Sequence, residues 1–511
     1  MSVTAIRRGK VQKMERKSGI LLPVFSLPSE YGIGSFGKEG YEFIDFLSRS
    51  GVKVWQVLPL VQTGYGNSPY SSVCSYSFNP YFISLETLAE ENLLDKSDFK
   101  RAKNDSFYVD YGALYNVRYP LLRKAFSKFN KDGEEFKKFV RAGRFYDYAL
   151  FSAIKTSTGY KPFYEWDDGL KRRDKVSIKK FSDENEEEIL FWQFVQFTAE
   201  KQWFSLKKYA NLKGVKIIGD MPLYVALDSV DVWTEPSLFK LDDNFIPKKI
   251  AGVPPDYFSK TGQLWGNPVY DYDRHKEDNF SWWRKRLKTA LRTFDYVRID
   301  HFRGLDRYYE VDNGRVDATV GEWVDVPGKE LFTAVSIDIG SGRIIAEDLG
   351  IIDDGVRKLL KFTGYPGMKI LSFAFNSESN NPYLPENIEE NSVCYTGTHD
   401  NDTLKGLIDN FSEWDYNNLI CGVKNSAELA GFDYSEINRE NVAEVMLELG
   451  FFCKAELFIF RLDDVLNLNS EYRINEPGTV KPQNWAVRLK SSDFSPSAAE
   501  KIRLLNLKYH R

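Results

Sequence analysis

Eight short, apolar, β-rich segments recur along this chain, and each closes in polar residues or in Gly or Pro. Most are near-continuous apolar runs, which is typical of parallel strands buried on both faces. Helical patterns lie between them, for example over 38–49, 282–292 and 354–362. Eight strands alternating with helices favour an α/β fold of the (β/α)₈ TIM-barrel type over an open sheet. The predicted strands cover residues 20–25, 52–59, 215–220, 296–300, 343–347, 368–373, 393–396 and 455–461.

The connections between these segments are uneven in length. The one from 60 to 214 is helical and charged, with charged runs at 124–138 and 183–188. A structureless loop of that length would be improbable in a compact domain. We therefore expect residues 1–511 to form a single barrel with large, mostly helical insertions on its C-terminal face. The largest covers about 60–214, and smaller ones cover about 226–280 and 303–341.

Charge and cysteine usage restrict the partners of the chain. Its 69 basic and 73 acidic residues give a formal charge of −4, without the basic footprint of a nucleic-acid binder. The apolar run at 20–25 is too short for a signal peptide, and no stretch approaches the roughly 20 apolar residues of a membrane span. The four cysteines form no CxxC pair, as is typical of free thiols in a reducing compartment. We expect a cytoplasmic protein without nucleic-acid or membrane partners and, with only four histidines, without a multi-histidine metal centre.

A glycine motif at 32–37, GIGSFG, satisfies the dinucleotide-binding pattern G-x-G-x-x-G. That motif also needs an acidic residue about 20 positions further on, at the end of the next strand. The predicted strand at 52–59 ends in QVLP, without an acid. We interpret the glycines as a βα loop and expect no nicotinamide cofactor.

The predicted strand at 296–300 carries the first candidate catalytic pair. Side chains alternate along a strand, so Arg298 and Asp300 project to the same side. An arginine beside a carboxylate lowers its pKa and keeps it ionised, which a nucleophilic carboxylate requires. A purely structural Arg–Asp pair inside the barrel would show the same pattern.

Two further strands end in acidic residues. The strand at 343–347 closes with Glu347 and Asp348, and two acids after a buried strand are costly unless solvated, paired or functional. The strand at 393–396 leads to His399 and Asp400. For the residues that follow, Asp402 and Thr403, we favour the role of helix caps.

Together these acids predict an enzyme of glycosidic bonds. Catalytic groups of TIM barrels come from the C-terminal ends of several strands. Two carboxyl groups flanking one bond, one ionised and one protonated, form the machinery of glycoside hydrolysis. A third acid can hold sugar hydroxyls while positive charge develops on the ring. The 15% aromatic content includes residues in polar, Gly-rich loops, where flat rings suit stacking on sugars.

These stretches resemble the amylomaltase, or disproportionating-enzyme, family of 4-alpha-glucanotransferases, which is glycoside hydrolase family 77 in the α-amylase clan. The resemblance rests on RIDHFRG at 298–304, AEDLG at 346–350 and TGTHDND at 396–402. It covers essentially the whole chain and is weakest over about 90–185. Further matching stretches are GDMP at 219–222, VW at 232–233, AGVPPDYF at 251–258, GQLWGNP at 262–268, NSPY at 67–70, NP at 79–80, SEYRIN at 470–475 and PG at 477–478.

The resemblance implies roles for individual positions. Asp300 corresponds to the nucleophile, Glu347 to the general acid/base and Asp400 to the transition-state stabiliser, without a cofactor or metal. It also implies a flexible lid over the acceptor side at 251–265. The substrates implied are α-1,4-glucans and maltooligosaccharides, with glucose as an acceptor. The candidate substrate-binding residues are Tyr70, Ser68, Asp220, Arg298, Asp256, Trp265, Asn267, His399 and Asn475.

Three alternatives to a transferase stay open at this point. A hydrolase of the α-amylase type would use the same acids with water as acceptor. A catalytically inert glucan-binding protein would be expected to lack one of the acids, and all three are present. An oxidoreductase would rest on the glycine motif alone.

Overall fold

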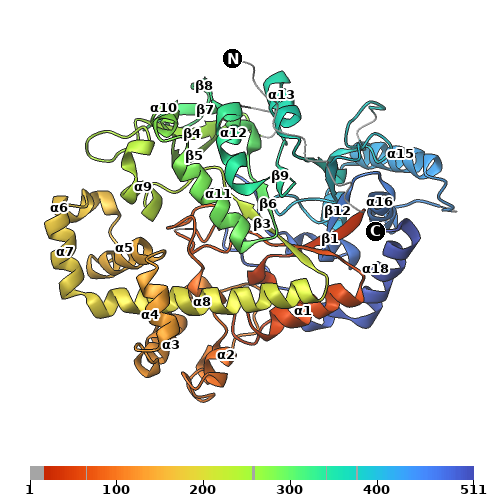
Figure 1. The fold of residues 1–511 in the computed structure, drawn as a ribbon. Coiled ribbons are helices and arrows are strands. Elements are labelled where there is room, and N and C mark those ends of the chain that lie inside the picture. Colours follow the sequence, from red (N-terminus) through yellow and green to blue (C-terminus); the bar gives the residue numbers. More distant parts are fainter. Residues whose placement is uncertain (1–15, 65, 256–258, 341, 376–377, 435) are drawn as a thin grey trace.

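The computed structural model describes residues 16–64, 66–255, 259–340, 342–375, 378–434 and 436–511 (Figure 1). Eight parallel strands form one sheet in the order β10-β11-β12-β1-β2-β3-β6-β9. Its two outer strands approach each other, and Ala346 N donates to Pro366 O at 3.0 Å, so the sheet is a nearly closed barrel. Its strands are β1 Lys17–Leu21, β2 Val54–Gln56, β3 Lys216–Met221, β6 Tyr296–Ile299, β9 Ile344–Ala346, β10 Gly367–Ile370, β11 Ser392–Tyr395 and β12 Leu457–Arg461.

The predicted TIM barrel is confirmed, and each predicted strand contains or overlaps an observed one. Burial on both faces explains the apolar runs, since Ile217, Ile218, Val297 and Ile299 are each 0% exposed. Several observed strands are shorter than predicted. The segment at 368–373, for example, leaves the sheet after Ile370 and continues as a 3₁₀ turn.

Helices follow the strands and surround the barrel (Figure 1). The helical patterns at 38–49, 282–292 and 354–362 correspond to α1, α11 and α13. α13 begins at a capping Asp353 and ends at Gly364, whose φ of 71° suits a residue without a side chain. The helices outside the β2–β3 connection are α1 Lys38–Arg49, α9 Val230–Thr234, α10 Tyr272–Glu277, α11 Ser281–Thr293, α12 Gly328–Ile339, α13 Asp354–Thr363, α14 Leu404–Asp409, α15 Glu413–Leu429, α16 Val442–Phe452, α17 Leu462–Val465 and α18 Pro496–Tyr509.

The connection between β2 and β3 is helical. Both charged runs that we noted there cross a helix boundary. The run at 124–138 passes from α3 to α4 across a turn capped by Gly133, and the run at 183–188 passes from α7 to α8 at Asn185. The helices of this connection are α2 Leu85–Glu90, α3 Tyr111–Lys128, α4 Glu134–Arg141, α5 Tyr146–Ser157, α6 Asp168–Lys171, α7 Lys175–Glu184 and α8 Glu186–Leu212.

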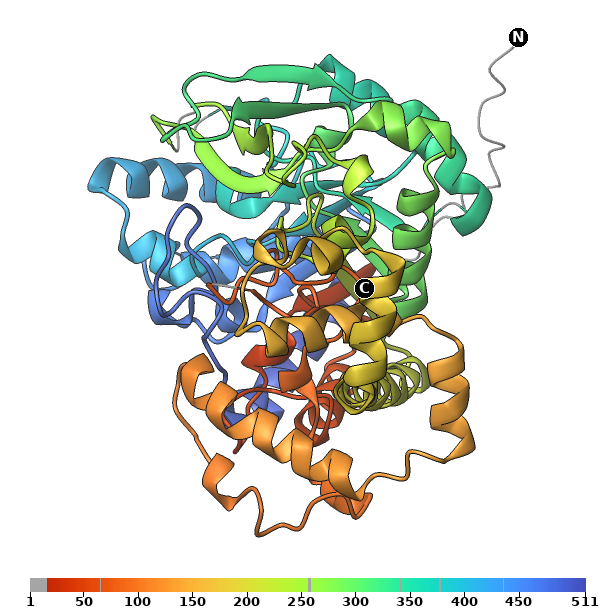
Figure 2. The same ribbon diagram turned by 90° about the vertical axis from the view of Figure 1, so that its left-hand side faces the viewer.

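A second, antiparallel sheet was not predicted from the sequence. It has the order β5-β4-β7-β8, with β4 Lys249–Val253, β5 Gln263–Pro268, β7 Arg307–Asp312 and β8 Glu322–Asp325. β4 pairs with β7, about sixty residues away, and a pairing so distant leaves no local sequence signal. In both views this sheet lies at the opposite end of the molecule from α2 and α3, with the barrel between them (Figures 1 and 2).

The GIGSFG glycines serve backbone packing, as the loop interpretation predicts. A side chain on Gly34 would lie 2.0 Å from Val24 O, and one on Gly37 would lie 2.3 Å from Ser84 Oγ. Gly37 also caps α1. The cysteines are free, and all but Cys421 are buried. Among the described helices, none is long and apolar enough to cross a membrane.

Candidate active site

The strand register brings the predicted acids to one end of the barrel. Met221 pairs with Ile299, and Ile299 pairs with Ala346, so β3, β6 and β9 end at the same level. Asp300 and Glu347 follow β6 and β9 directly. In the same sheet, Asp400 lies in the loop after β11.

Arg298 joins the carboxyl groups of two neighbouring strands. Its Nη1 lies 2.8 and 2.7 Å from the two oxygens of Asp220 and 3.0 Å from Asp300 Oδ1. The side chains of Arg298 and Asp220 are 4% and 0% exposed, whereas that of Asp300 is 28% exposed. Arg298 and Asp300 therefore project to the same side, as strand alternation predicts. The sequence did not show that the nearer partner of Arg298 is Asp220.

Arg298 lowers the pKa of Asp300, as expected, but burial outweighs it and the pKa is raised overall. Burial raises the pKa of Asp300 to about 7, and the negative charges of Asp220 and Asp400 add to the effect while Arg298 opposes it. The physical reason is that one buried guanidinium nitrogen is shared between two carboxylates, with Asp220 the closer.

The pKa of Glu347 is raised as well. Burial raises its pKa to about 8; Arg298 opposes this, and the charge of Asp300 adds to it. The backbone N–H groups of His301 and Leu349 donate to its two oxygens at 2.7 and 2.8 Å and fix their orientation. Because the charge of Asp300 disfavours ionisation of Glu347, the pair holds one proton between its two ionisations, and Arg298, 3.0 Å from Asp300 Oδ1, favours Asp300 as the ionised member.

Asp400 is held from the segment that follows β12. Asn475 Nδ2 donates to Asp400 Oδ1 at 2.6 Å, and Arg473 Nη2 donates to the Asp400 carbonyl at 2.8 Å. His399 Nε2 lies 3.4 Å from Asp400 Oδ2, and burial lowers the pKa of His399, which favours the neutral imidazole. Asp400 itself is 44% exposed and so presents a carboxylate to a ligand.

Tyr70 lies over the same group of side chains. Its hydroxyl donates to Asp220 Oδ2 at 2.7 Å, and its ring stacks on His399 with centroids 5.0 Å apart and planes 20° apart. Trp485 packs against both rings, at 5.6 Å from Tyr70 and 5.7 Å from His399. Trp485 was not predicted from the sequence, where the high aromatic content was its only signal.

Three of the remaining predicted residues contact groups other than the acids, and one lies outside the described residues. Ser68 Oγ accepts from Tyr70 N at 3.2 Å within its own loop, and Asn267 Nδ2 donates to the Val225 carbonyl at 2.8 Å. Trp265 is 36% exposed and meets the His301 ring edge-on at 4.8 Å. Asp256 lies outside the described residues.

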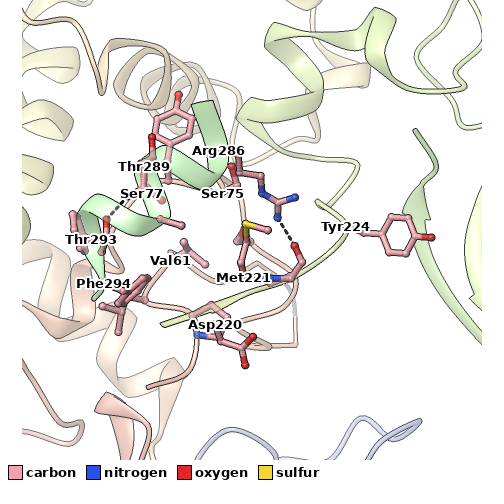
Figure 3. Close-up of a pocket in the computed structure, with 17 residues that line it drawn as sticks. Val61, Ser75, Ser77, Asp220, Met221, Tyr224, Arg286, Thr289, Thr293 and Phe294 are labelled. Carbon is pink, nitrogen blue, oxygen red and sulfur yellow. Dashed lines mark hydrogen bonds between the residues drawn. The ribbon is translucent and has the colours of Figure 1, made fainter. Parts of the chain in front are cut away.

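Two supporting residues were also missed. His301 has a left-handed backbone, with φ of 51°, that aims its N–H at Glu347; it lies inside the RIDHFRG motif, which was the available signal. Arg286 on α11 lines a cavity of about 50 Å³ beside Asp220 (Figure 3). Its guanidinium donates to the carbonyls of Pro222 and Leu223 and so fastens the turn that follows Asp220.

The other acids noted in the sequence have local partners. Asp348 accepts from Met368 N at 2.6 Å and so fixes the start of β10. Thr403 caps α14, as predicted. Asp402 is not the capping residue; it binds Thr403 N and the Ser470 hydroxyl instead. Among the described residues, no group of three or more His, Cys, Asp or Glu side chains is placed to hold a metal ion.

The site therefore combines two carboxyl groups with raised pKa values and a third, partly exposed carboxyl group. On the C-terminal face of a (β/α)₈ barrel, this arrangement defines an enzyme that acts on glycosidic bonds through carboxyl groups. A family model described as 4-alpha-glucanotransferase, glycoside hydrolase family 77, matches residues 22–493. The chain belongs to this family.

Proteins similar to this chain match it over nearly its full length. The 4-alpha-glucanotransferase of Clostridium butyricum is 43% identical over 495 residues, covering 96% of this chain and 99% of that protein. That of Aquifex aeolicus is 43% identical, covering 93% and 96%. The amylomaltase of Streptococcus agalactiae, solved in complex with acarbose, has a TM-score of 0.91 at 38% identity and covers 97% of this chain and 100% of that one. The predicted family and 4-alpha-glucanotransferase activity are confirmed, and the hydrolase alternative has less support.

Proposed function

We propose that this enzyme transfers segments of α-1,4-glucan from a donor maltooligosaccharide or starch chain to the 4-hydroxyl of an acceptor glucose or glucan. The proposal assigns Asp300 as nucleophile, Glu347 as general acid/base and Asp400 as transition-state stabiliser. One observation carries the assignment: both carboxyl groups end neighbouring strands at the same level, and Arg298 lies 3.0 Å from Asp300 Oδ1. An arginine beside one of two carboxyl groups favours it as the ionised nucleophile and leaves the other to carry the proton.

The reaction then proceeds by double displacement with retention. Ionised Asp300 attacks the anomeric carbon, and Glu347 gives its proton to the departing glycosidic oxygen. This breaks the glycosidic bond and forms a glycosyl ester on Asp300. Glu347, now ionised, takes the proton of the acceptor 4-hydroxyl, whose oxygen attacks the anomeric carbon and releases Asp300. No step needs a metal or an organic cofactor.

The surrounding residues suit a sugar in the donor position. Asp400 and Asn475 form a hydrogen-bonded pair that can receive sugar hydroxyls. Tyr70 offers a ring that is already held by Asp220 and His399, so stacking on a sugar costs little side-chain entropy. The acarbose bound to the similar Streptococcus agalactiae amylomaltase supports a ligand of this class.

We also propose that the inserted segments favour transfer over hydrolysis. The insertions at about 60–214, 226–280 and 303–341 would surround the barrel's C-terminal face. The segment at 251–265, which includes the end of β4 and the start of β5, would close over a bound acceptor. Closure excludes water, and a well-placed acceptor can reach an effective molarity of ~10⁵ M or more. Trp265, in β5 at the end of this segment, packs against His301, the residue after Asp300.

We also propose a cytoplasmic location. The free cysteines support it, because thiols stay reduced in that compartment.

Product analysis with maltotriose as the sole substrate tests this function. We expect glucose together with a ladder of longer maltooligosaccharides, and little net gain in reducing ends. Products limited to glucose and maltose, with reducing ends rising in step, would identify a hydrolase. Asp300→Asn and Asp400→Asn test the residue assignment, since each should remove the ladder.

A further inference from the structure

Arg461, the last residue of β12, is a buried charge that the proposed mechanism does not use. The residue is 1% exposed. Its Nε donates to both carboxylate oxygens of Asp463 at 3.0 Å. Its two terminal nitrogens reach three backbone carbonyls: Nη1 donates to Thr398 O at 3.3 Å and Asn401 O at 2.8 Å, and Nη2 to Tyr472 O at 3.1 Å.

These carbonyls belong to two segments that meet at Asp400. Thr398 and Asn401 bracket His399 and Asp400 in the loop after β11. Tyr472 begins the segment that leads to Asn475, whose side chain donates to Asp400 Oδ1 and whose backbone N donates to His399 O at 3.0 Å. The guanidinium of Arg461 therefore connects both segments, the loop that carries Asp400 and the segment that carries Asn475, to the end of β12.

Stability alone is a weak explanation for such a group. A buried ion pair often contributes no more to folding than apolar residues of similar volume, because desolvation offsets the attraction. The planar fork of Arg461, however, fixes three carbonyl positions at once, which the single ammonium of a lysine does not. Precise placement matters here, because a displacement of ~1 Å in a catalytic group can cost about 10²-fold in rate.

We propose that Arg461 is a positioning residue that sets the place of Asp400 and Asn475 against the donor sugar. The proposal rests on the proposed role of Asp400. Asp400 is proposed to act in the transition state, so loss of the Arg461 guanidinium should lower kcat more than it changes KM.

Arg461→Lys is the direct test, with Arg118→Lys as its matched control. Arg118 is also a buried arginine, 2% exposed, and donates to the carbonyls of Ile83 and Tyr31 at 3.2 and 3.1 Å. We expect Arg461→Lys to lower kcat for maltotriose transfer by about 10- to 100-fold with KM within about threefold. We expect both variants to lose similar thermal stability, and the control to keep its kcat within about threefold.

A double-mutant cycle with Asn475→Ala separates positioning from general damage. If Arg461 acts through the Asp400–Asn475 contact, Arg461→Lys should lower kcat by only a few-fold in the Asn475→Ala background, which is less than the product of the single effects. Effects that multiply fully would overturn the proposal, as would a kcat for Arg461→Lys no lower than that of the control.

Two further variants cover the other outcomes. If Arg461→Lys does not fold, Asp463→Asn takes its place as the test, because it keeps the guanidinium of Arg461 and removes the charge of its carboxylate partner. A several-fold lower kcat of Asp463→Asn with unchanged KM supports the proposal. An unchanged kcat overturns it. Asp400→Asn tests the underlying function separately. If it retains activity within tenfold, the role of Asp400 fails; if it is inactive while Arg461→Lys matches its control, only the positioning proposal fails.

Discussion

Replacing Asp300 with Asn should abolish transfer and, at the same time, stabilise the folded protein at neutral pH. Burial, together with the negative charges of Asp220 and Asp400, raises the pKa of Asp300 from its ordinary value of 3.8 to about 7. Arg298 opposes this but shares its Nη1 with Asp220. A neutral amide cannot form the glycosyl ester, and it also removes the charge that the site disfavours.

The folded pKa of Asp300 lies above the unfolded value, so its ionisation costs the folded state free energy. The cost is absent below about pH 4, grows as the pH rises to about 7, and is complete above that. At about 1.4 kcal/mol per pKa unit, it is at most ~4 kcal/mol. This cost is already net of the attraction to Arg298, which lowers the pKa of Asp300. We therefore expect a gain of at most ~4 kcal/mol, or at most ~4 °C in Tm for 511 residues.

Thermal unfolding of the wild type, Asp300→Asn and Asp220→Asn at pH 4 and pH 8 measures the effect. Asp300→Asn should exceed the wild-type Tm at pH 8 and match or fall below it at pH 4. Asp220→Asn should be destabilised by ~3–5 kcal/mol at pH 8, because it leaves Arg298 without its principal buried partner. A lower Tm for Asp300→Asn at pH 8 would refute the reasoning from charge repulsion. Transfer activity within tenfold of wild type would show that another residue is the nucleophile.

Three further predictions concern neighbouring residues. Glu347→Gln should lose transfer from maltotriose but still release fluoride from α-glucosyl fluoride. The fall in kcat/KM above about pH 8, which we expect for the wild type as Glu347 loses its proton, should be absent from the variant's fluoride release. If the variant keeps this fall, another group is responsible for that ionisation. Tyr70→Phe should weaken donor binding by about 1 kcal/mol, because the hydrogen bond to Asp220 is lost. Tyr70→Ala should weaken donor binding by ~1–3 kcal/mol more and give a larger share of hydrolysis, because the stacking ring is lost as well. If the two substitutions change KM equally, the ring does not stack on the sugar. His301→Gly should be more stable to unfolding than His301→Ala by ~1 kcal/mol, because position 301 has φ of 51°; equal Tm values would contradict this.

Much of the barrel was predictable because its signals are local. Apolar runs at strand positions reflect burial on both faces, and residues such as Ile299 and Ile345 are buried for that reason. The side shared by Arg298 and Asp300 follows from strand alternation alone. The antiparallel sheet was missed, because the β4–β7 pairing depends on two segments that meet only in the folded chain.

The sequence by itself determined which acids end the strands, and hence the family and the chemistry. Only the tertiary structure decided how those acids behave. Tyr70 and Asp220 are 150 residues apart and share a hydrogen bond, and Arg461 reaches carbonyls about 60 residues earlier in the chain. The pKa of Asp300 depends on burial and on charges from other strands and loops. A local pattern carries no information on these quantities, because they are set by through-space distances and by exclusion of water.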